Sequence, residues 1–250
     1  MPAELERIYG SLGFGQRVLY SNFVASLDGV ASLGDTPSAG SVISGRNPAD
    51  RFLLALLRAC ADAVLVGAGT LRATPGHHWT PQHTFPALAD EFAALRKSLG
   101  RRPDPRLVIL TRSGNIDPQH PALADGATVV TPRRGVLERL PKGTDLIATD
   151  DLGKALGELR SRGFDVLLTE GGPHVMGELI AGGMLDEVFL TVSPVIAGRD
   201  QEMRLGMAAG VELLPARAVW GRLLSLRRHG DYLFTRYGLP ARGEDGEARG

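Results

Sequence analysis

The chain has 250 residues, of which 43% are hydrophobic and 22% are charged, a balance typical of a soluble globular protein with a sizeable core. Lysine plus arginine number 28, and so do aspartate plus glutamate. This zero formal charge argues against a nucleic-acid-binding protein, which would show a basic excess. Cys60, the one cysteine, excludes an intramolecular disulfide and a cysteine-based zinc cluster, and its apolar surroundings predict a buried structural thiol.

The sequence also bears on the compartment. The first residues show no basic stretch followed by an apolar core, as a signal peptide would. No window reaches the roughly 18 apolar residues that a membrane span needs. We therefore expect a cytoplasmic protein that binds neither nucleic acid nor membrane.

The first three quarters of the chain alternate apolar, β-rich runs with segments of helical pattern. Strands are expected at Val18–Ala25, Ala63–Val66, Arg106–Leu110 and Asp165–Thr169. Helices are expected at Asn47–Ala61, Pro86–Leu99, Asp151–Arg162 and His174–Gly182. This alternation predicts an α/β fold with a central, mostly parallel sheet flanked by helices.

The last quarter has a different pattern. Strands are expected at Asp186–Val192, Arg217–Leu226 and Asp231–Tyr237, and the turn around Arg227–Gly230 predicts an antiparallel C-terminal hairpin. Since no linker interrupts the middle of the chain, we expect a single domain at residues 16–238. Residues 1–15 would be an N-terminal extension, and the Gly-, Glu- and Arg-rich residues 239–250 a disordered tail.

Two glycine-bearing segments directly follow expected strands. In Val66–Thr70, Gly67 and Gly69 allow a ligand to approach the backbone and receive N–H hydrogen bonds on a phosphate. The dinucleotide fingerprint is incomplete because Arg72 replaces its third glycine, so a plain strand–turn–helix connection stays open. The second segment, Thr169–His174, could be a tight turn that precedes a helix. A turn does not require Glu170, so this residue favours a functional role for the segment. Because ligands bind at the carboxyl ends of strands in such sheets, the two segments predict one crevice.

Two further segments place polar side chains after strands. Thr111, Arg112 and Ser113 follow the strand at 106–110, where an arginine flanked by hydroxyl groups can hold a phosphate. In a dinucleotide enzyme this position reads the ribose 2′-phosphate and favours NADPH over NADH, although a solvated surface arginine is the alternative. Asp28 belongs either to a simple Asp-Gly turn or to the same crevice.

The adjacent His77, His78 and Trp79 lie in a proline-rich loop. Neighbouring histidines point in different directions and no carboxylate is close in sequence, so we do not expect a metal site. Substrate contact by this loop stays open, and plain surface exposure is the simpler expectation.

In this order, the motifs resemble the reductase domain of the bacterial riboflavin-biosynthesis deaminase–reductase family, a relative of dihydrofolate reductase. The matching segments are Ala25–Gly29, Leu57–Ala59, Val66–Thr70, Glu170–Pro173, Leu185–Glu187 and Pro194–Gly198. The resemblance runs from about Val18 to Tyr237. It implies a dihydrofolate reductase-like fold, an NADPH cofactor, hydride transfer to a pyrimidine- or pteridine-like small molecule, and a homodimer.

The resemblance also implies roles for single residues. Cofactor contacts would fall on Ala25, Thr70, Thr111 and the run Gly172, Pro173, His174, Val175, Met176, Gly177 and Glu178, and substrate contacts on Arg58 and Glu170. We further hypothesise that the backbones of Gly67–Thr70 and Gly171–His174 hold the pyrophosphate, and that Thr111, Arg112 and Ser113 hold the 2′-phosphate. Asp28 and Glu170 are the candidate catalytic carboxylates: Glu170 would anchor the substrate, and Asp28 would set the loop geometry or relay the proton.

The chain departs from the family pattern in two places. With one cysteine it carries no Pro-Cys-x-x-Cys zinc-deaminase signature, so we expect a stand-alone reductase. Thr70–His78 lacks the paired aspartates and the downstream arginine that grip the ribose phosphate in the family. The expected activity is that of a 5-amino-6-(5-phosphoribosylamino)uracil reductase-like enzyme, or alternatively reduction of a folate. A Rossmann-like methyltransferase and a nucleotide-binding protein without turnover are the competing classes.

Overall fold

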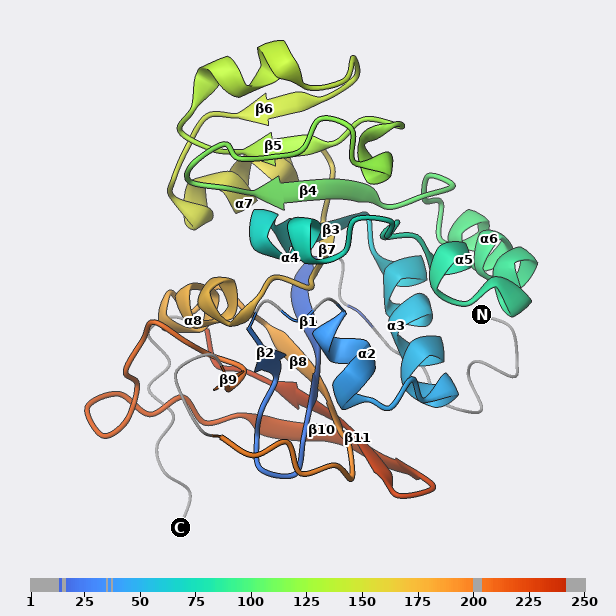
Figure 1. Ribbon diagram of the computed structural model, residues 1–250, viewed down its shortest axis with the longest axis vertical. Helices are drawn as coiled ribbons and strands as arrows, with labels where there is room; N and C mark the ends of the chain where they lie inside the picture. The colour runs from blue at the N-terminus through green and yellow to red at the C-terminus, as the bar shows by residue number, and fades with distance from the viewer. Residues whose placement is uncertain (1–13, 15–16, 35, 37, 200–203, 242–250) are drawn as a thin grey trace. The chain divides into compact units, whose positions relative to one another are not determined.

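The fold is seen in a computed structural model of the chain (Figure 1), which describes residues 14, 17–34, 36, 38–199 and 204–241. These residues form two compact units. Unit 1 contains the described residues up to Val18 together with Arg51–Thr169, and unit 2 contains Leu19–Asp50 and the described residues from Glu170 onward. None of the helices in the described part of the chain is long and apolar enough to cross a bilayer.

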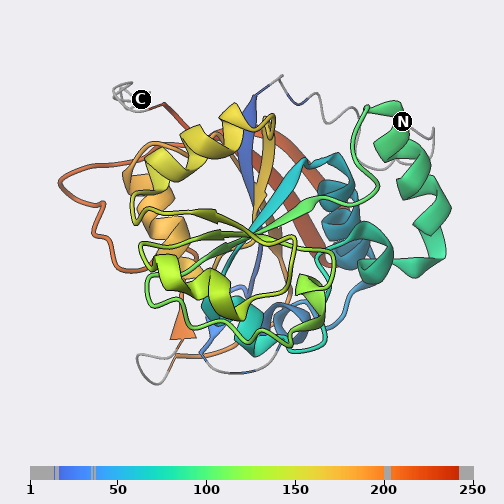
Figure 2. The ribbon, with the colours of Figure 1, turned by 90° about the horizontal axis from the view of Figure 1, so that it is seen from above.

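Unit 1 carries a parallel sheet with the strand order β7-β3-β4-β5-β6. Its strands are β3 (Ala63–Gly67), β4 (Arg106–Leu110), β5 (Thr128–Val130), β6 (Asp145–Ile147) and β7 (Val166–Thr169). Figure 2 shows them fanned by the twist that parallel strands accumulate. The predictions of β3, β4 and β7 are confirmed to within one residue at each end. The sequence analysis missed β5 and β6 because three residues are too few to show a periodic pattern.

Some of the helices of unit 1 begin at a side-chain cap. They are α3 (Pro48–Cys60, whose first residues belong to unit 2), α4 (Ala68–Ala73), α5 (Pro81–Thr84), α6 (Ala89–Ser98) and α7 (Leu152–Ser161), with short 3₁₀ turns at Pro86–Leu88, Pro121–Leu123 and Arg134–Arg139. The Asn47 side chain accepts the Ala49 N–H at 2.8 Å. The Asp151 side chain accepts the Lys154 N–H at 3.0 Å, so it caps α7.

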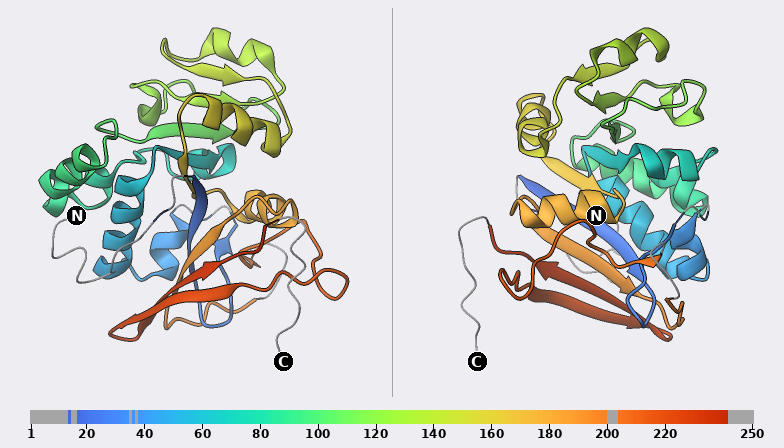
Figure 3. Two further views of the ribbon diagram at one scale, coloured as in Figure 1. Left: turned by 180° about the vertical axis from the view of Figure 1, so that it is seen from behind. Right: turned by 60° about the vertical axis from the view of Figure 1, so that its left-hand side comes forward.

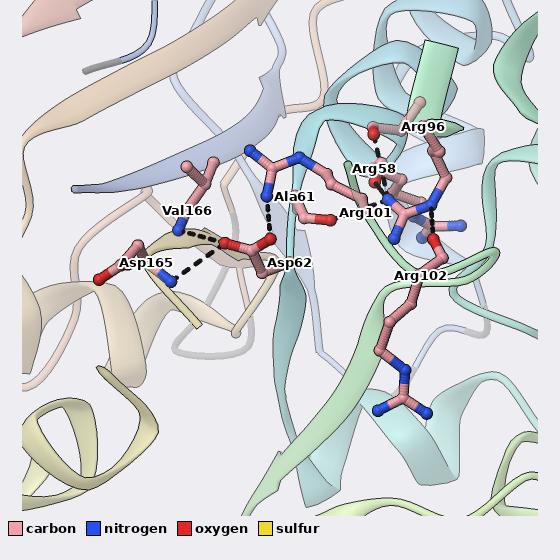
Figure 4. Close-up of polar contacts among 9 residues, drawn as sticks. Arg58, Ala61, Asp62, Arg96, Arg101, Arg102, Asp165 and Val166 are labelled. Atoms are coloured by element: carbon pink, nitrogen blue, oxygen red, sulfur yellow. Dashed lines mark hydrogen bonds and ion pairs between the residues drawn. The ribbon is translucent and has the colours of Figure 1, made fainter. Parts of the chain in front are cut away.

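A polar network holds the amino end of the unit 1 sheet (Figure 4). Arg96 of α6 is 1% exposed, and its Nη1 donates to the carbonyl oxygens of Arg58, Ala59 and Ala61 at 3.1, 3.0 and 2.8 Å. These are carbonyls at the end of α3, which a helix leaves without intrahelical partners. The Asp62 carboxylate, just before β3, accepts the Val166 N–H at 2.7 Å and forms an ion pair with Arg101. The network therefore ties α3, α6, β3 and β7 together.

Unit 2 carries a mixed sheet with the order β10-β11-β8-β1, in which β1 and β8 are parallel and the other pairs antiparallel. Its elements are β1 (Val18–Ala25), α2 (Ala39–Ile43), α8 (Pro173–Ala181), β8 (Glu187–Val192), β10 (Arg222–His229) and β11 (Tyr232–Gly238), and β2 (Ser32–Leu33) pairs with β9 (Arg204–Leu205). The long β10–β11 hairpin is drawn in red in Figure 3.

The antiparallel C-terminal hairpin is confirmed, but its predicted bounds are wrong. β10 begins at Arg222 rather than at 217 and continues to His229, so the turn is shorter than the one expected at Arg227–Gly230. The reversal centres on Gly230, whose φ of 58° favours glycine. The expected extension 1–15 lies outside the described residues apart from Phe14, and so does the expected tail apart from 239–241. The single-domain assignment stays a prediction.

Candidate functional site

In unit 1, the expected cofactor residues gather at the carboxyl ends of two neighbouring strands. Gly67 ends β3 and is in register with Leu110, which ends β4. Gly67 is also the N-cap of α4, with an extended backbone and no side-chain cap, and Gly69 and Thr70 follow in that helix. Thr111, Arg112 and Ser113 follow β4, and Arg112 and Ser113 are exposed. The structure thus places the glycine segment and the Thr-Arg-Ser segment at the same edge of the sheet.

Arg72 connects α4 to the loop that follows the Thr-Arg-Ser segment, a contact not expected from the sequence. Its Nη1 donates to the Asn115 carbonyl oxygen at 3.1 Å, and its Nη2 lies 3.9 Å from where a Cβ at Gly69 would stand. Its signal in the sequence is the arginine that stands in place of the third glycine of the fingerprint. Arg72 and Arg112, both exposed, place guanidinium groups at this edge of the sheet, and guanidinium groups recognise phosphate.

Arg58, a predicted substrate contact, lies on the last turn of α3 and is 1% exposed. Its Nη1 donates to Thr84 Oγ1, lies 3.0 Å from His77 Nε2 and reaches the His78 carbonyl oxygen at 3.4 Å. A buried guanidinium requires such acceptors, so the loop folds back over α3. Trp79 is 4% exposed, and the expectation of plain surface is therefore wrong for this residue. Direct substrate contact by Arg58 stays a prediction.

In unit 2, Asp28 holds a loop. Its carboxylate accepts the Ser26 hydroxyl at 2.6 Å and the N–H groups of Ala197 and Gly198 at 3.0 and 2.8 Å. These hydrogen bonds, that of Ser26 foremost, lower the pKa of Asp28 to about 2. A carboxyl group that is ionised at neutral pH has no proton to give, so the geometry favours the loop-holding role over the proton relay. Gly29, with φ of 79°, completes the turn.

The segment from Glu170 to Glu178 contributes the start of α8. Gly172 is its N-cap without a side-chain hydrogen bond, Pro173 is its first residue, and its first turn has no acidic side chain. The first N–H groups of a helix lack intrahelical acceptors and suit an anion. Ala25, at the end of β1, is 7% exposed. Glu170, directly before this segment, is half-buried.

The predicted cofactor run 172–178 does not lie along one face of α8. Met176 is fully buried, and a Cβ at Gly177 would stand 2.3 Å from the Ala209 carbonyl oxygen. Gly177 thus allows the segment at 209–211 to pack closely against the helix. His174 is exposed, and its Nδ1 lies 3.0 Å from where a Cβ at Gly210 would stand. Cofactor contact by Val175 and Glu178, both half-buried, stays a prediction.

The sequence analysis did not single out Asp50, a buried carboxyl group in the first turn of α3. Burial raises the pKa of Asp50, and the hydroxyls of Thr191 and Ser44 partly oppose this shift. Thr191 is in register with Val24, close to the end of β1. Two residues earlier on β1, the Asn22 Oδ1 atom is buried and has no hydrogen-bond partner among the described residues. This face of unit 2 therefore combines a protonatable acid with a buried acceptor, and its sequence signal was only an acidic residue at a helix start.

Comparison with known proteins identifies the family. The profile of the RibD C-terminal domain matches residues 17–215, most of the chain. The chain belongs to the RibD C-terminal domain family. This membership agrees with the motif order, from the Ala25–Gly29 turn to the Pro194–Gly198 turn.

Curated and solved relatives of this RibD-family chain agree with the assignment. The riboflavin biosynthesis protein RibD of Mycobacterium tuberculosis is 29% identical over 177 residues, which cover 70% of this chain and 42% of that protein. The chain thus spans less than half the length of this curated relative. A pyrimidine reductase-like protein from Corynebacterium diphtheriae superposes with a TM-score of 0.71 at 24% identity, covering 94% of this chain and 98% of that one.

RibD of Acinetobacter baumannii also superposes with a TM-score of 0.71, at 20% identity over 95% of this chain and 62% of that one. At these identities the structural matches show the fold, and they confirm the predicted reductase-type α/β architecture. Among the described residues, no three histidine, cysteine, aspartate or glutamate side chains are grouped as metal ligands.

Proposed function

We propose that the protein is an NADPH-dependent reductase acting on a pyrimidine- or pteridine-like small molecule, similar to the 5-amino-6-(5-phosphoribosylamino)uracil reductases. The observation that carries the cofactor proposal is the edge at the ends of β3 and β4. There Gly67 is in register with Leu110, directly before Thr111–Ser113, and Arg72 of α4 donates to the Asn115 carbonyl oxygen in the loop that follows.

The residues of this edge fit a dinucleotide. Gly69 leaves its surroundings open, since a Cβ there would meet nothing nearer than the Arg72 Nη2 at 3.9 Å. In unit 1, Arg112, with Thr111 and Ser113, would hold the 2′-phosphate, and Arg72 would add a second cation. In unit 2, the first-turn N–H groups of α8 would hold a phosphate, and Gly172 has open space where a Cβ would stand. The bound NADPH supplies the hydride.

For the proton that accompanies reduction, we propose Asp50 in place of Asp28. Asp28 is ionised and committed to three hydrogen bonds, whereas burial favours the protonated form of Asp50. A carboxyl group of raised pKa can hold a proton near neutral pH and hydrogen-bond a heterocycle that accepts it. Glu170 is kept as the substrate anchor. A folate is the second candidate substrate, because Thr70–His78 lacks the aspartates and arginine of the resembling reductases.

We also propose a cytoplasmic homodimer that binds neither nucleic acid nor membrane. β10 is the edge strand of unit 2, and Leu223, Leu226 and Leu233 on the hairpin are 49%, 55% and 39% exposed. An apolar, exposed edge strand is covered in most native proteins, and a second copy would cover it here. The segment at 185–198 is another candidate interface, in which Leu185 is buried and Ile196 is 73% exposed. The hairpin is therefore the better candidate interface.

Titration with NADPH and NADH, followed by nicotinamide fluorescence, tests the function. Wild type should prefer NADPH, and Arg112→Ala should weaken NADPH about 10- to 100-fold while changing NADH little, since one charge-assisted phosphate contact contributes about 1.5–3 kcal/mol. Arg139→Ala, an exposed arginine of the 134–139 turn, is the control. If neither NADPH nor NADH binds, the proposal that the protein is a reductase is refuted. Turnover assays with dihydrofolate and the riboflavin-pathway pyrimidine then separate the two substrates.

A further inference from the structure

Four of the six histidines of the protein gather around Trp79 in unit 1. His77 lies against Trp79 and His83, with ring centroids 4.9 and 5.0 Å apart. The ring centroids of His78 and His83 are 5.2 Å apart, and those of His120 and Trp79 are 5.9 Å apart. We call these four histidines and Trp79 the histidine cluster. The residues come from three separate segments, so the sequence shows only the His77-His78-Trp79 part.

The hydrogen bonds of two of these histidines determine their protonation. The Arg58 guanidinium has only donors, so the His77 Nε2 atom 3.0 Å away must be an acceptor, and the ring proton sits on Nδ1. His120 Nδ1 accepts the Ala122 N–H at 3.2 Å, and its Nε2 lies 3.1 Å from the Thr74 carbonyl oxygen, which requires a proton there. His77 and His120 are therefore neutral, and His77 presents an N–H on the side away from Arg58.

The charged groups that act on the cluster are positive. Burial lowers the pKa of His77 to about 3, and Arg58, His83 and His78 lower it further. The pKa of His83 is lowered by burial and then by His78, Arg58 and Arg51. The acidic side chains of the adjoining segments are engaged elsewhere: Asp104 accepts the Gln82 side chain at 2.6 Å, and Asp117 accepts the Gln119 N–H at 2.9 Å.

The cluster is accessible from solvent, since His83 is exposed and His77 and His78 are half-buried. We propose that the histidine cluster binds the phosphate group of a small-molecule ligand, with His78 and His83 as imidazolium donors and His77 Nδ1–H as a neutral donor. The positive charges of neighbouring histidines disfavour one another, and a bound anion stabilises these charged forms. Binding of the anion therefore takes up protons and weakens as the pH rises. The phosphate binding itself does not depend on the proposed function. Only the assignment of this phosphate to the substrate of the reductase rests on it.

Phosphate binding is measurable on the full chain without cofactor. The nitrogen-15 labelled protein is titrated with inorganic phosphate against potassium chloride of equal ionic strength, and the imidazole resonances are recorded near pH 6 and near pH 8, on either side of the usual imidazole pKa of about 6.5. We expect saturable shifts of His77, His78 and His83, a raised pKa of His83, and about tenfold weaker binding near pH 8.

The double variant His78→Gln, His83→Gln should lose the saturable shifts while keeping the thermal midpoint of wild type, because His83 is exposed and His78 half-buried. His229→Gln, on the exposed strand β10, is the matched control and should bind phosphate as wild type does. Equal shifts with potassium chloride, retention of binding in the double variant, or binding of zinc but not of phosphate would each overturn the proposal. NADPH titration of the same double variant shows separately whether the reductase site is intact.

Discussion

Replacing Arg96 by methionine tests the account of how unit 1 is held together. The Arg96 side chain is 1% exposed, and its guanidinium serves four carbonyl oxygens: those of Arg58, Ala59 and Ala61 through Nη1, and that of Arg102 through Nε at 2.8 Å. Methionine keeps much of the aliphatic volume and removes the donors. The Arg58 oxygen keeps the Ala61 N–H at 3.2 Å, so the loss falls on the other three carbonyls; each buried carbonyl left unsatisfied costs about 1–3 kcal/mol, and such costs are not additive. We therefore expect a loss of about 3–5 kcal/mol in the free energy of unfolding, near the top of the range for single substitutions.

Equilibrium urea unfolding followed by circular dichroism measures this loss. The midpoint should fall while the slope with denaturant stays unchanged, because the surface exposed on unfolding is the same. Arg102→Met is the matched control: its side chain is exposed and only its backbone carbonyl joins the network, so it should stay within about 0.5 kcal/mol of wild type. A loss below about 1 kcal/mol in Arg96→Met would refute the view that Arg96 caps α3.

Four further outcomes follow from single side chains. Because the pKa of Asp28 is lowered to about 2 from 3.8, its stabilising contribution is complete above pH 3.8 and is lost as the pH falls toward 2, so the stability difference between wild type and Asp28→Asn should shrink there in acid unfolding experiments; a constant difference would contradict this. Asp50 has the opposite sign: its raised pKa makes wild type lose stability as the pH rises above 3.8, so Asp50→Asn should be the more stable protein at neutral pH by urea unfolding, yet turn over poorly without losing NADPH affinity. Leu226→Glu, on the proposed hairpin interface, should yield monomers in sedimentation equilibrium. The control Leu99→Glu changes an exposed leucine outside the hairpin and should leave the dimer intact. Cys60, whose pKa burial raises to about 12, should react with a thiol reagent only after unfolding, and reaction in the native state would argue against the packing of α3.

Patterns that involve neighbouring residues were readable from the sequence. The strands β1, β3, β4 and β7 were predicted because continuous apolar runs bounded by turn residues are local features. The start of α3 followed from Asn47-Pro48, and the start of α7 from Asp151, since a cap acts on N–H groups two or three residues away. The glycine segment at 67–70 and the Thr-Arg-Ser segment follow two adjacent parallel strands, whose carboxyl ends lie at one edge, and their contacts to a cofactor stay a prediction.

Partners that lie far apart in the sequence were settled by the tertiary structure. Asp28 could be assigned to loop geometry only when the N–H groups of Ala197 and Gly198 were seen to reach it. In the sequence Asp50 is simply an acidic residue at a helix start, and only the tertiary structure shows that its carboxyl group is buried, which raises its pKa. Tertiary contacts likewise bring His83 against His77 and His120 against Trp79. Periodicity, caps and strand ends are short-range properties that the sequence by itself determined, whereas burial, charge state and the choice of hydrogen-bond partner depend on which distant segments the fold brings into contact.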